Sequence, residues 1–216
     1  MNSADTSSAP RAVDGRVPGR RGRATRRRLL DATASLLGTH TYRDLKVVDI
    51  ARAAGTSPAT FYQYFPDVET AVLTLAQEMV DEGADRLAAL VSDDWQGEAG
   101  PASAERLARG VLTFWDERQA LIRVLDLASH EGDQRFRDLR TRLLGGISDA
   151  LHDLLRRQQA AGYLGDDSDP AAVAGVLVSM LAHVAAHRPG LEAWGADRHE
   201  MEATMADILR WSITGA

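Results

Sequence analysis

The chain has 216 residues, of which 44% are hydrophobic and 26% charged, a composition typical of a folded globular protein of one large domain or two small ones. It contains no cysteine, which excludes disulfide bonds, thiolate zinc sites and cysteine nucleophiles. Residues 1–66 carry eleven Lys or Arg against five Asp or Glu, whereas residues 67–216 carry fourteen against twenty-six. A basic N-terminal third on an acidic body favours an N-terminal segment that binds a polyanion.

The N-terminus predicts a disordered basic tail over residues 1–19, because this stretch lacks apolar periodicity. The first thirty residues are rich in arginine and contain no apolar run of the signal-peptide type, so we expect a cytoplasmic protein. An arginine-rich run, RRGRATRRR, covers residues 20–28. Such a run is often only a solvated face, but here it borders a DNA-binding pattern, which favours a role in nucleic-acid binding.

Three short helices are predicted next, over residues 26–37, 44–54 and 58–65. Gly55 ends the second of them, because glycine is favoured directly after a helix. Ser57 and Pro58 predict the start of the third helix, since serine caps free amide groups and proline is favoured in the first turn.

The rest of the chain predicts further helices and no strand, and therefore an all-α protein. A long amphipathic helix is expected over residues 67–91 and a loop over 92–101. The later helices are expected over residues 103–118, 119–129, 134–161, 170–187 and 197–214. The pair Gly145-Gly146 inside one of them predicts either a kink or a closely packed neighbour.

Residues 47–65, VVDIARAAGTSPATFYQYF, fit a helix-turn-helix. The motif needs small residues where its two helices touch and a glycine at the turn, and Ala51 and Gly55 meet these needs. Its small core is predicted to consist of Ile50, Ala54, Phe61 and Phe65. The outward positions of the second helix are then Thr60, Tyr62, Gln63 and Tyr64. Threonine packs on a thymine methyl, glutamine pairs with adenine and a tyrosine hydroxyl reaches phosphate, which predicts a recognition helix.

The sequence resembles the TetR/AcrR family of bacterial transcriptional regulators over residues 25–75, on the stretches RRRLLDATASLL and VVDIARAAGTSPATFYQYFPDVETAV. The resemblance implies DNA contacts by the four outward residues of the recognition helix and phosphate contacts near Lys46, Thr56 and Ser57. Val68 stands where the family often has a lysine that contacts phosphate. We expect the arginine-rich arm, with Arg20, Arg21 and Arg23, to replace that contact by reaching the DNA backbone or a minor groove.

The domain organisation predicted from these features is a three-helix helix-turn-helix DNA-binding domain over residues 20–66 and a helical ligand-binding and dimerisation domain over residues 67–216. Residues 170–187 carry no formal charge but include Ser179, His183 and His187. A membrane span needs about 20 predominantly apolar residues, so we interpret this helix as buried between its own core and a partner subunit. The last helix adds a stripe of Met201, Met205, Ile208, Leu209 and Ser212. Two such helices from each chain form a four-helix interface, and the resemblance implies the same homodimer.

Ten residues of the body are candidates to line a ligand cavity: Phe114, Trp115, Leu121, Leu125, Phe136, Leu143, Ile147, Leu151, Met180 and His183. The alternative is that they form a filled core, and the cavity itself is implied mainly by the resemblance. The expected effector is a small apolar or weakly polar molecule. His183 and His187 are four residues apart but lack an obvious third ligand, so no metal and no cofactor is predicted.

The predicted function is that of a ligand-responsive transcriptional regulator, a repressor that an effector releases from a palindromic operator in double-stranded DNA. Two alternatives stay open. An architectural DNA-binding protein without an effector requires a collapsed body, and an all-α enzyme built on the histidines requires convergent titratable groups that the sequence does not show. The chain contains no G-x-S-x-G, P-loop or G-x-G-x-x-G motif, so we expect a protein that is not an enzyme.

Overall fold

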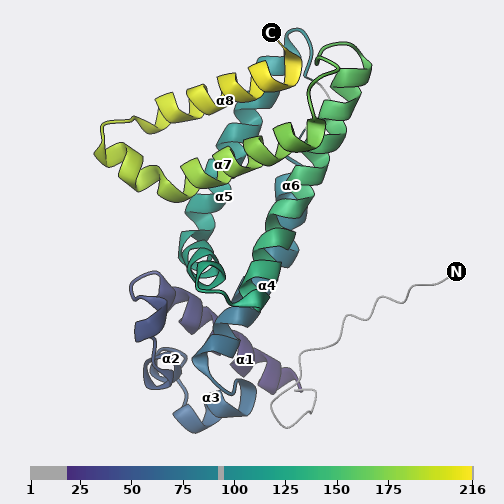
Figure 1. The fold of residues 1–216 in the computed structure, drawn as a ribbon. Coiled ribbons are helices and arrows are strands. Elements are labelled where there is room, and N and C mark those ends of the chain that lie inside the picture. Colours follow the sequence, from purple (N-terminus) through teal and green to yellow (C-terminus); the bar gives the residue numbers. More distant parts are fainter. Residues whose placement is uncertain (1–18, 92–94, 216) are drawn as a thin grey trace, which may run out of the picture. The chain divides into compact units, whose positions relative to one another are not determined.

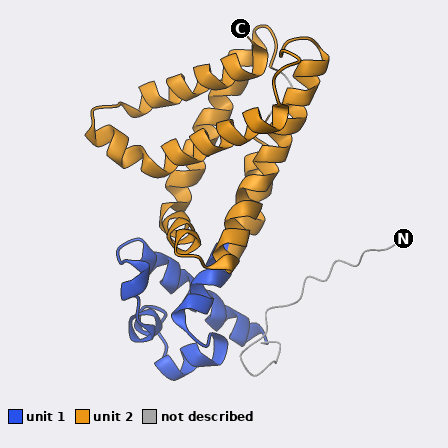
Figure 2. Cartoon of the chain, in the orientation of Figure 1, with its two compact units in different colours: residues 1–76 blue, residues 77–216 orange. Residues whose placement is uncertain are grey.

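The computed structural model describes residues 19–91 and 95–215, and all secondary structure in these two ranges is helical (Figure 1). The all-α prediction is thereby confirmed. Contacts divide the chain into two compact units, unit 1 over residues 1–76 and unit 2 over residues 77–216 (Figure 2). The tail predicted to be disordered lies, apart from residue 19, outside the described residues.

Unit 1 contains α1 (Arg20–Leu37), a short 3₁₀ helix (Tyr42–Asp44), α2 (Val47–Ala53), α3 (Pro58–Tyr64) and the first turns of α4 (Val68–Ala88). The predicted start of the first helix at residue 26 is wrong, because the helix begins at Arg20. Arginine and alanine favour a helix, and threonine disfavours it only slightly, so residues 20–28 can extend the helix toward the N-terminus. Gly22 is the one glycine in this stretch, and a helix interior tolerates a single glycine. Arg20, Arg21 and Arg23 therefore belong to a helix and not to an extended arm.

The core of unit 1 forms where α1, α2 and α3 meet. The four residues predicted to fill it are all buried: Ile50, Ala54, Phe61 and Phe65. Ala51 is fully buried as well, as the close contact between the two helices of the motif requires. The rings of Phe61 and Phe65 are 5.6 Å apart between centroids, and the guanidinium of Arg26 lies 5.1 Å from the Phe65 centroid. One face of α3 is therefore held in the core, and the opposite face is left outside.

Unit 2 contains the rest of α4 together with α5 (Ala99–His130), α6 (Gln134–Ala160), α7 (Pro170–Ala193) and α8 (Arg198–Thr214). The long helix α5 packs against α6, α7 and α8. Two helices predicted over 103–118 and 119–129 are in fact this one helix, since neither glycine nor proline occurs between Val111 and His130 to end it. The helix predicted to end at residue 187 runs on to Ala193, with Pro189 exposed inside its last turns.

Two glycines allow α4 to pack closely on its neighbours. A Cβ atom added to Gly146 of α6 would lie 3.1 Å from the carbonyl oxygen of Ala84 in α4. A Cβ atom added to Gly83 of α4 would lie only 2.6 Å from the ring of Phe114 in α5. Since α6 is continuous through the pair, Gly146 serves the close approach of a neighbour, the second of the two predicted roles, whereas a Cβ atom added to Gly145 would meet nothing within 4 Å.

Charged residues join α5 to the last two helices. Asp116 of α5 accepts hydrogen bonds from Arg188 of α7 and from Arg198 of α8, the latter at 2.5 Å. Burial lowers the pKa of Arg188, but its hydrogen bonds to Glu192 and Asp116 outweigh this effect and raise the pKa above its usual value. One carboxylate thus ties three helices together.

Helices α7 and α8 are joined by a short turn and lie side by side (Figure 1). Among the described helices, α7 is the one that is long and apolar enough to cross a membrane, and only 33% of its apolar window is buried within the chain. Val176, in its second turn, is 68% exposed. In α8, the predicted apolar stripe divides: Met205 and Leu209 are buried inside the unit, whereas Met201, Ile208 and Ser212 are half-buried at its edge.

Candidate functional site

The turn between α2 and α3 is shaped by Gly55, whose φ of +65° lies in the left-handed region. The Gly55 N–H donates to the carbonyl of Arg52 at 3.1 Å, and the Thr56 N–H donates to the carbonyl of Ala51 at 2.9 Å. These two hydrogen bonds use carbonyl groups that the end of α2 would otherwise leave free. The chain therefore turns within three residues, as a helix-turn-helix requires.

Ser57 begins α3 as predicted. Its Oγ accepts a hydrogen bond from the backbone N–H of Thr60 at 3.2 Å, and Pro58 occupies the first helical position. The hydroxyl groups of Ser57 and Thr60 also lie 3.0 Å apart and share a hydrogen bond. Asp67 caps α4 in the same way, with its Oδ1 accepting from the Thr70 N–H at 2.7 Å. The starts of α3 and α4 are thus both set by local side-chain chemistry.

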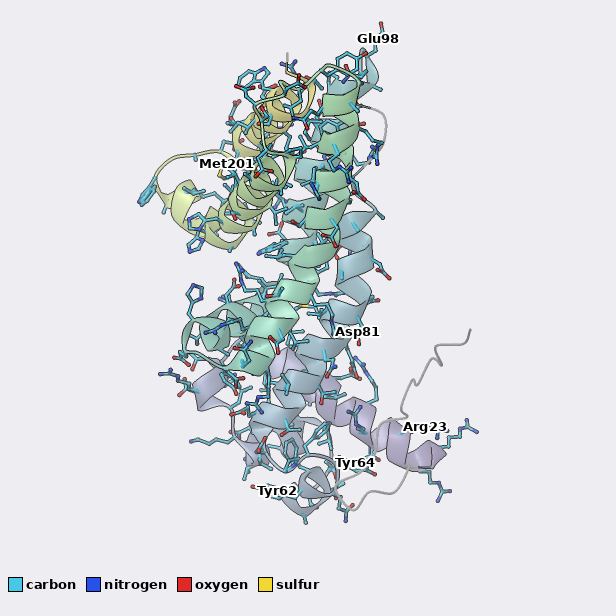
Figure 3. The ribbon with its side chains drawn as sticks, turned by 45° about the vertical axis from the view of Figure 1, so that its right-hand side comes forward. Arg23, Tyr62, Tyr64, Asp81, Glu98 and Met201 are labelled. Carbon is cyan, nitrogen blue, oxygen red and sulfur yellow. The ribbon has the colours of Figure 1, made fainter. Side chains whose placement is uncertain are left out.

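The outward face of α3 carries the residues that the sequence predicts for DNA contact. Tyr62 is 52% exposed and Gln63 is exposed, while Thr60 and Tyr64 are half-buried. Figure 3 shows Tyr62 and Tyr64 on this helix. An aromatic hydroxyl and a side-chain amide on one exposed helical face can donate to phosphates and pair with base edges in a major groove.

The basic residues predicted to contact DNA are also accessible. Arg20, Arg21 and Arg23 are exposed in the first turns of α1, and Lys46 is exposed directly before α2 (Arg23 is labelled in Figure 3). Ser57 is exposed, and Thr56 is half-buried at the turn. Every residue predicted to face DNA therefore lies on unit 1 and reaches its surface at least in part.

Unit 2 contains a cavity of about 610 Å³ between α5, α6 and α7. Four of the ten predicted lining residues line it: Trp115, Leu125, Leu143 and His183. Ile147 lines a much smaller adjoining cavity, which Trp115 shares. The other five predicted residues line neither cavity: Phe114, Leu121, Phe136, Leu151 and Met180.

The wrong predictions have a physical cause. Phe114 packs against Gly83, and the guanidinium of Arg86 lies 5.6 Å from its ring centroid. Phe136 and Leu151 are buried in the helical core instead. A prediction based on apolar residues also left out the polar part of the cavity wall, which consists of Arg123, Asp126, His130, Arg140, Ser179 and His187. If the sequence had been interpreted as one unbroken helix over 99–130, several of these residues would have been predicted. Residues 115, 122, 126 and 130 are spaced so that they lie on one face of such a helix.

The two histidines of α7 stack on each other. The rings of His183 and His187 stack at 4.0 Å between centroids, and Nδ1 of His187 donates to the carbonyl of His183 at 3.0 Å. Within residues 19–91 and 95–215, no three His, Asp or Glu side chains lie close enough to hold a metal ion.

The geometry of unit 1 defines a helix-turn-helix protein of the kind that binds DNA. Residues 29–69 match the family described as bacterial regulatory proteins, tetR family, and residues 87–216 match the family described as Tetracyclin repressor-like, C-terminal domain. The chain therefore belongs to the TetR family of transcriptional regulators.

Similar proteins agree with this assignment. The chain is 26% identical to the HTH-type transcriptional regulator YdgC of Bacillus subtilis, over 76% of this chain and 80% of YdgC. It is 33% identical to the HTH-type regulator EthR of Mycolicibacterium smegmatis over about half of each chain (51% and 49%). It shares its fold with the regulator FadR of Bacillus subtilis in complex with stearoyl-CoA, with a TM-score of 0.63, 15% identity, and coverage of 88% of this chain and 98% of FadR.

Proposed function

We propose that this regulator is a homodimeric repressor, that α3 of each subunit reads one half of a pseudo-palindromic operator, and that a small molecule bound between α5, α6 and α7 releases the DNA. The observation that carries the proposal is the presence, in one chain, of an exposed recognition face on unit 1 and a 610 Å³ cavity in unit 2. Ligand cavities typically measure about 300–1,000 Å³. The fold neighbour FadR was solved in complex with stearoyl-CoA, which supports a bound effector for this chain as well.

The two rival functions are less well supported. An architectural DNA-binding protein binds no effector and so does not require a cavity of this size in unit 2. An enzyme needs a group of titratable side chains placed around one reacting atom, whereas Asp126 and Arg140 in the cavity wall are paired with each other at 2.8 Å.

A dimer interface on α7 and α8 accounts for the uncharged outer surface of α7. Ala172, Gly175, Val176 and Ser179 are exposed on one side of this helix, and Trp211 of α8 is 54% exposed. Small and apolar side chains on a helix that is two-thirds unburied favour cover by a second helix pair.

Helix α4 is the element through which we propose the effector acts, because it is continuous from unit 1 into unit 2. In unit 2, Arg86 of α4 forms an ion pair at 2.5 Å with Glu117 of α5, the helix that lines the cavity. The hydrogen bond from Arg86 lowers the pKa of the Glu117 carboxyl, so this pair stays charged at neutral pH. A shift of α5 on effector binding would therefore displace α4 and change the spacing of the recognition helices.

The experiment that tests the proposal begins with selection of the operator from random double-stranded DNA by the purified protein. The proposal expects a sequence with two-fold symmetry whose half-sites have centres about 34 Å apart or a multiple of it. Metabolite extracts added to the complex should then contain a molecule that lowers operator affinity. Selection of an asymmetric site, or of no preferred sequence, would contradict the proposal.

Tyr62→Ala is expected to weaken operator binding by about 1–3 kcal/mol, because it removes an exposed aromatic side chain and its hydroxyl from the recognition face. The measurement is operator affinity at fixed salt, with helicity followed by circular dichroism. Tyr163→Ala is the matched control, since Tyr163 is similarly exposed (49%) but lies in unit 2. Equal affinities of the two variants would remove Tyr62 from the set of contacts.

Replacement of Arg20 and Arg21 by Gln is expected to flatten the salt dependence of operator binding. Each lost phosphate contact should reduce the slope of log affinity against log salt by about 0.9. Arg156→Gln, at an exposed position of α6 in unit 2, shows how much the loss of one positive charge outside unit 1 changes the slope. An unchanged slope in the double variant would mean that the start of α1 is only a solvated surface.

A further inference from the structure

The cavity of unit 2 has two chemically different walls. Five large apolar side chains form one of them: Trp115, Ile122, Leu125, Leu143 and Leu144. The other contains the charged and polar side chains of Arg123, Asp126, His130, Arg140, Ser179, His183 and His187. A purely apolar occupant would leave the second wall without partners, so the cavity favours a molecule with an apolar part and a polar part.

The polar wall carries an excess of positive charge. Asp126 is the one carboxylate in the wall, and it already accepts a hydrogen bond from Nε of Arg140 at 2.8 Å. Arg123 is exposed at the cavity, and its guanidinium makes no hydrogen bond or ion pair with any residue in the described ranges. This arginine is therefore available to an anionic group, which a guanidinium binds through two parallel hydrogen bonds.

Two of the histidines keep one ring nitrogen free of the protein's own hydrogen bonds among the described residues. The Nδ1 atoms of His130 and His187 donate to the backbone carbonyls of Asp126 and His183, at 2.7 and 3.0 Å. A carbonyl only accepts, so each ring carries a proton on Nδ1 and has Nε2 left for other partners.

We infer that the effector is an amphipathic organic anion with a carboxylate or phosphate group beside Arg123. Its apolar part packs against Leu125, Leu143 and Leu144. This inference rests on the proposed function, since it specifies the chemistry of the effector. It refines the expectation of an apolar molecule by adding an anionic end.

The test measures direct binding to the full-length protein, without DNA, by calorimetry. The probes are decanoate, decyl phosphate and decylammonium, each used below its aggregation concentration. We expect decanoate or decyl phosphate to bind at least about tenfold more tightly than decylammonium, because hydrogen bonds to a charged group are strong. The tighter of the two anions identifies the head group.

Two substitutions assign this preference to its residue. Arg123→Gln should abolish the preference for the anion. Arg156→Gln, which removes the same charge from an exposed position outside the cavity wall, should leave the preference unchanged. Because Arg123 is exposed, its variant is expected to fold.

The outcomes separate this inference from the proposed function. Equal or tighter binding of decylammonium, unchanged preferences in Arg123→Gln, or binding of no probe would overturn the inference. Binding of the operator by the protein without probes would be unaffected in each of these cases. Failure to select a symmetric operator would instead contradict the proposed function, whatever the probes do.

Discussion

Substitution of Val176 by Asp is expected to convert the protein into a folded monomer that has lost most of its operator affinity. Val176 is 68% exposed in the second turn of α7, on a side that otherwise presents Ala172, Gly175 and Ser179. In the proposed dimer this side meets the partner subunit, so each introduced carboxylate would be buried without a cation. Such burial costs several kcal/mol per charge. The fold of the single chain would be retained, because Val176 contributes little to its own core.

Loss of the dimer explains the expected loss of DNA binding. One recognition helix reads half a site, and two must lie about 34 Å apart to read both halves. Light scattering gives the oligomeric state, circular dichroism the helix content, and titration the operator affinity. The control is Ala203→Asp, at an exposed position of α8 near Glu200 and Asp207. A Val176→Asp protein that remains dimeric would place the interface on another face.

Val176 is a better site for this test than Ile208, which the sequence alone would select. Ile208 is half-buried at the edge of α8, beside residues that pack inside the unit. An aspartate there would disturb both the core of the subunit and the proposed interface. Its effect on oligomeric state would be mixed with an effect on folding.

The second large effect is expected for Phe61→Ala, which should unfold unit 1 and abolish operator binding while the dimer persists. Phe61 is fully buried and packs on the ring of Phe65. Truncation of a buried phenylalanine to alanine costs about 3–5 kcal/mol. A small helical unit has little stability beyond that amount, since whole domains are stable by only about 5–15 kcal/mol.

Unfolding by urea, followed by circular dichroism, measures this effect, and light scattering shows whether the dimer remains. Phe61→Leu is the control, because a hydrophobic replacement of similar volume typically costs less than about 1.5 kcal/mol. This variant should keep its operator affinity. Full operator affinity in Phe61→Ala would show that the core of unit 1 does not depend on this ring.

Local chemistry determined much of this protein from the sequence alone. Gly55 at the turn, Ser57-Pro58 at the start of α3 and Asp67 at the start of α4 act on backbone groups within a few residues of themselves. The same holds for Asp169, whose carboxylate accepts from the Ala171 N–H at the start of α7. Because these effects need no distant partner, the helix-turn-helix, its buried residues and its exposed tyrosine were predictable.

The tertiary structure decided those features that depend on contacts between residues far apart in the sequence. The cavity wall combines Trp115 and Arg123 of α5 with Leu143 of α6 and His183 of α7, so periodicity within each helix does not show which residues face it. Phe114 and Trp115 are adjacent, yet one packs against Gly83 and the other lines the cavity. The direction of a side chain within a helical bundle depends on which neighbours pack against that helix, and this information is absent from any short stretch of sequence.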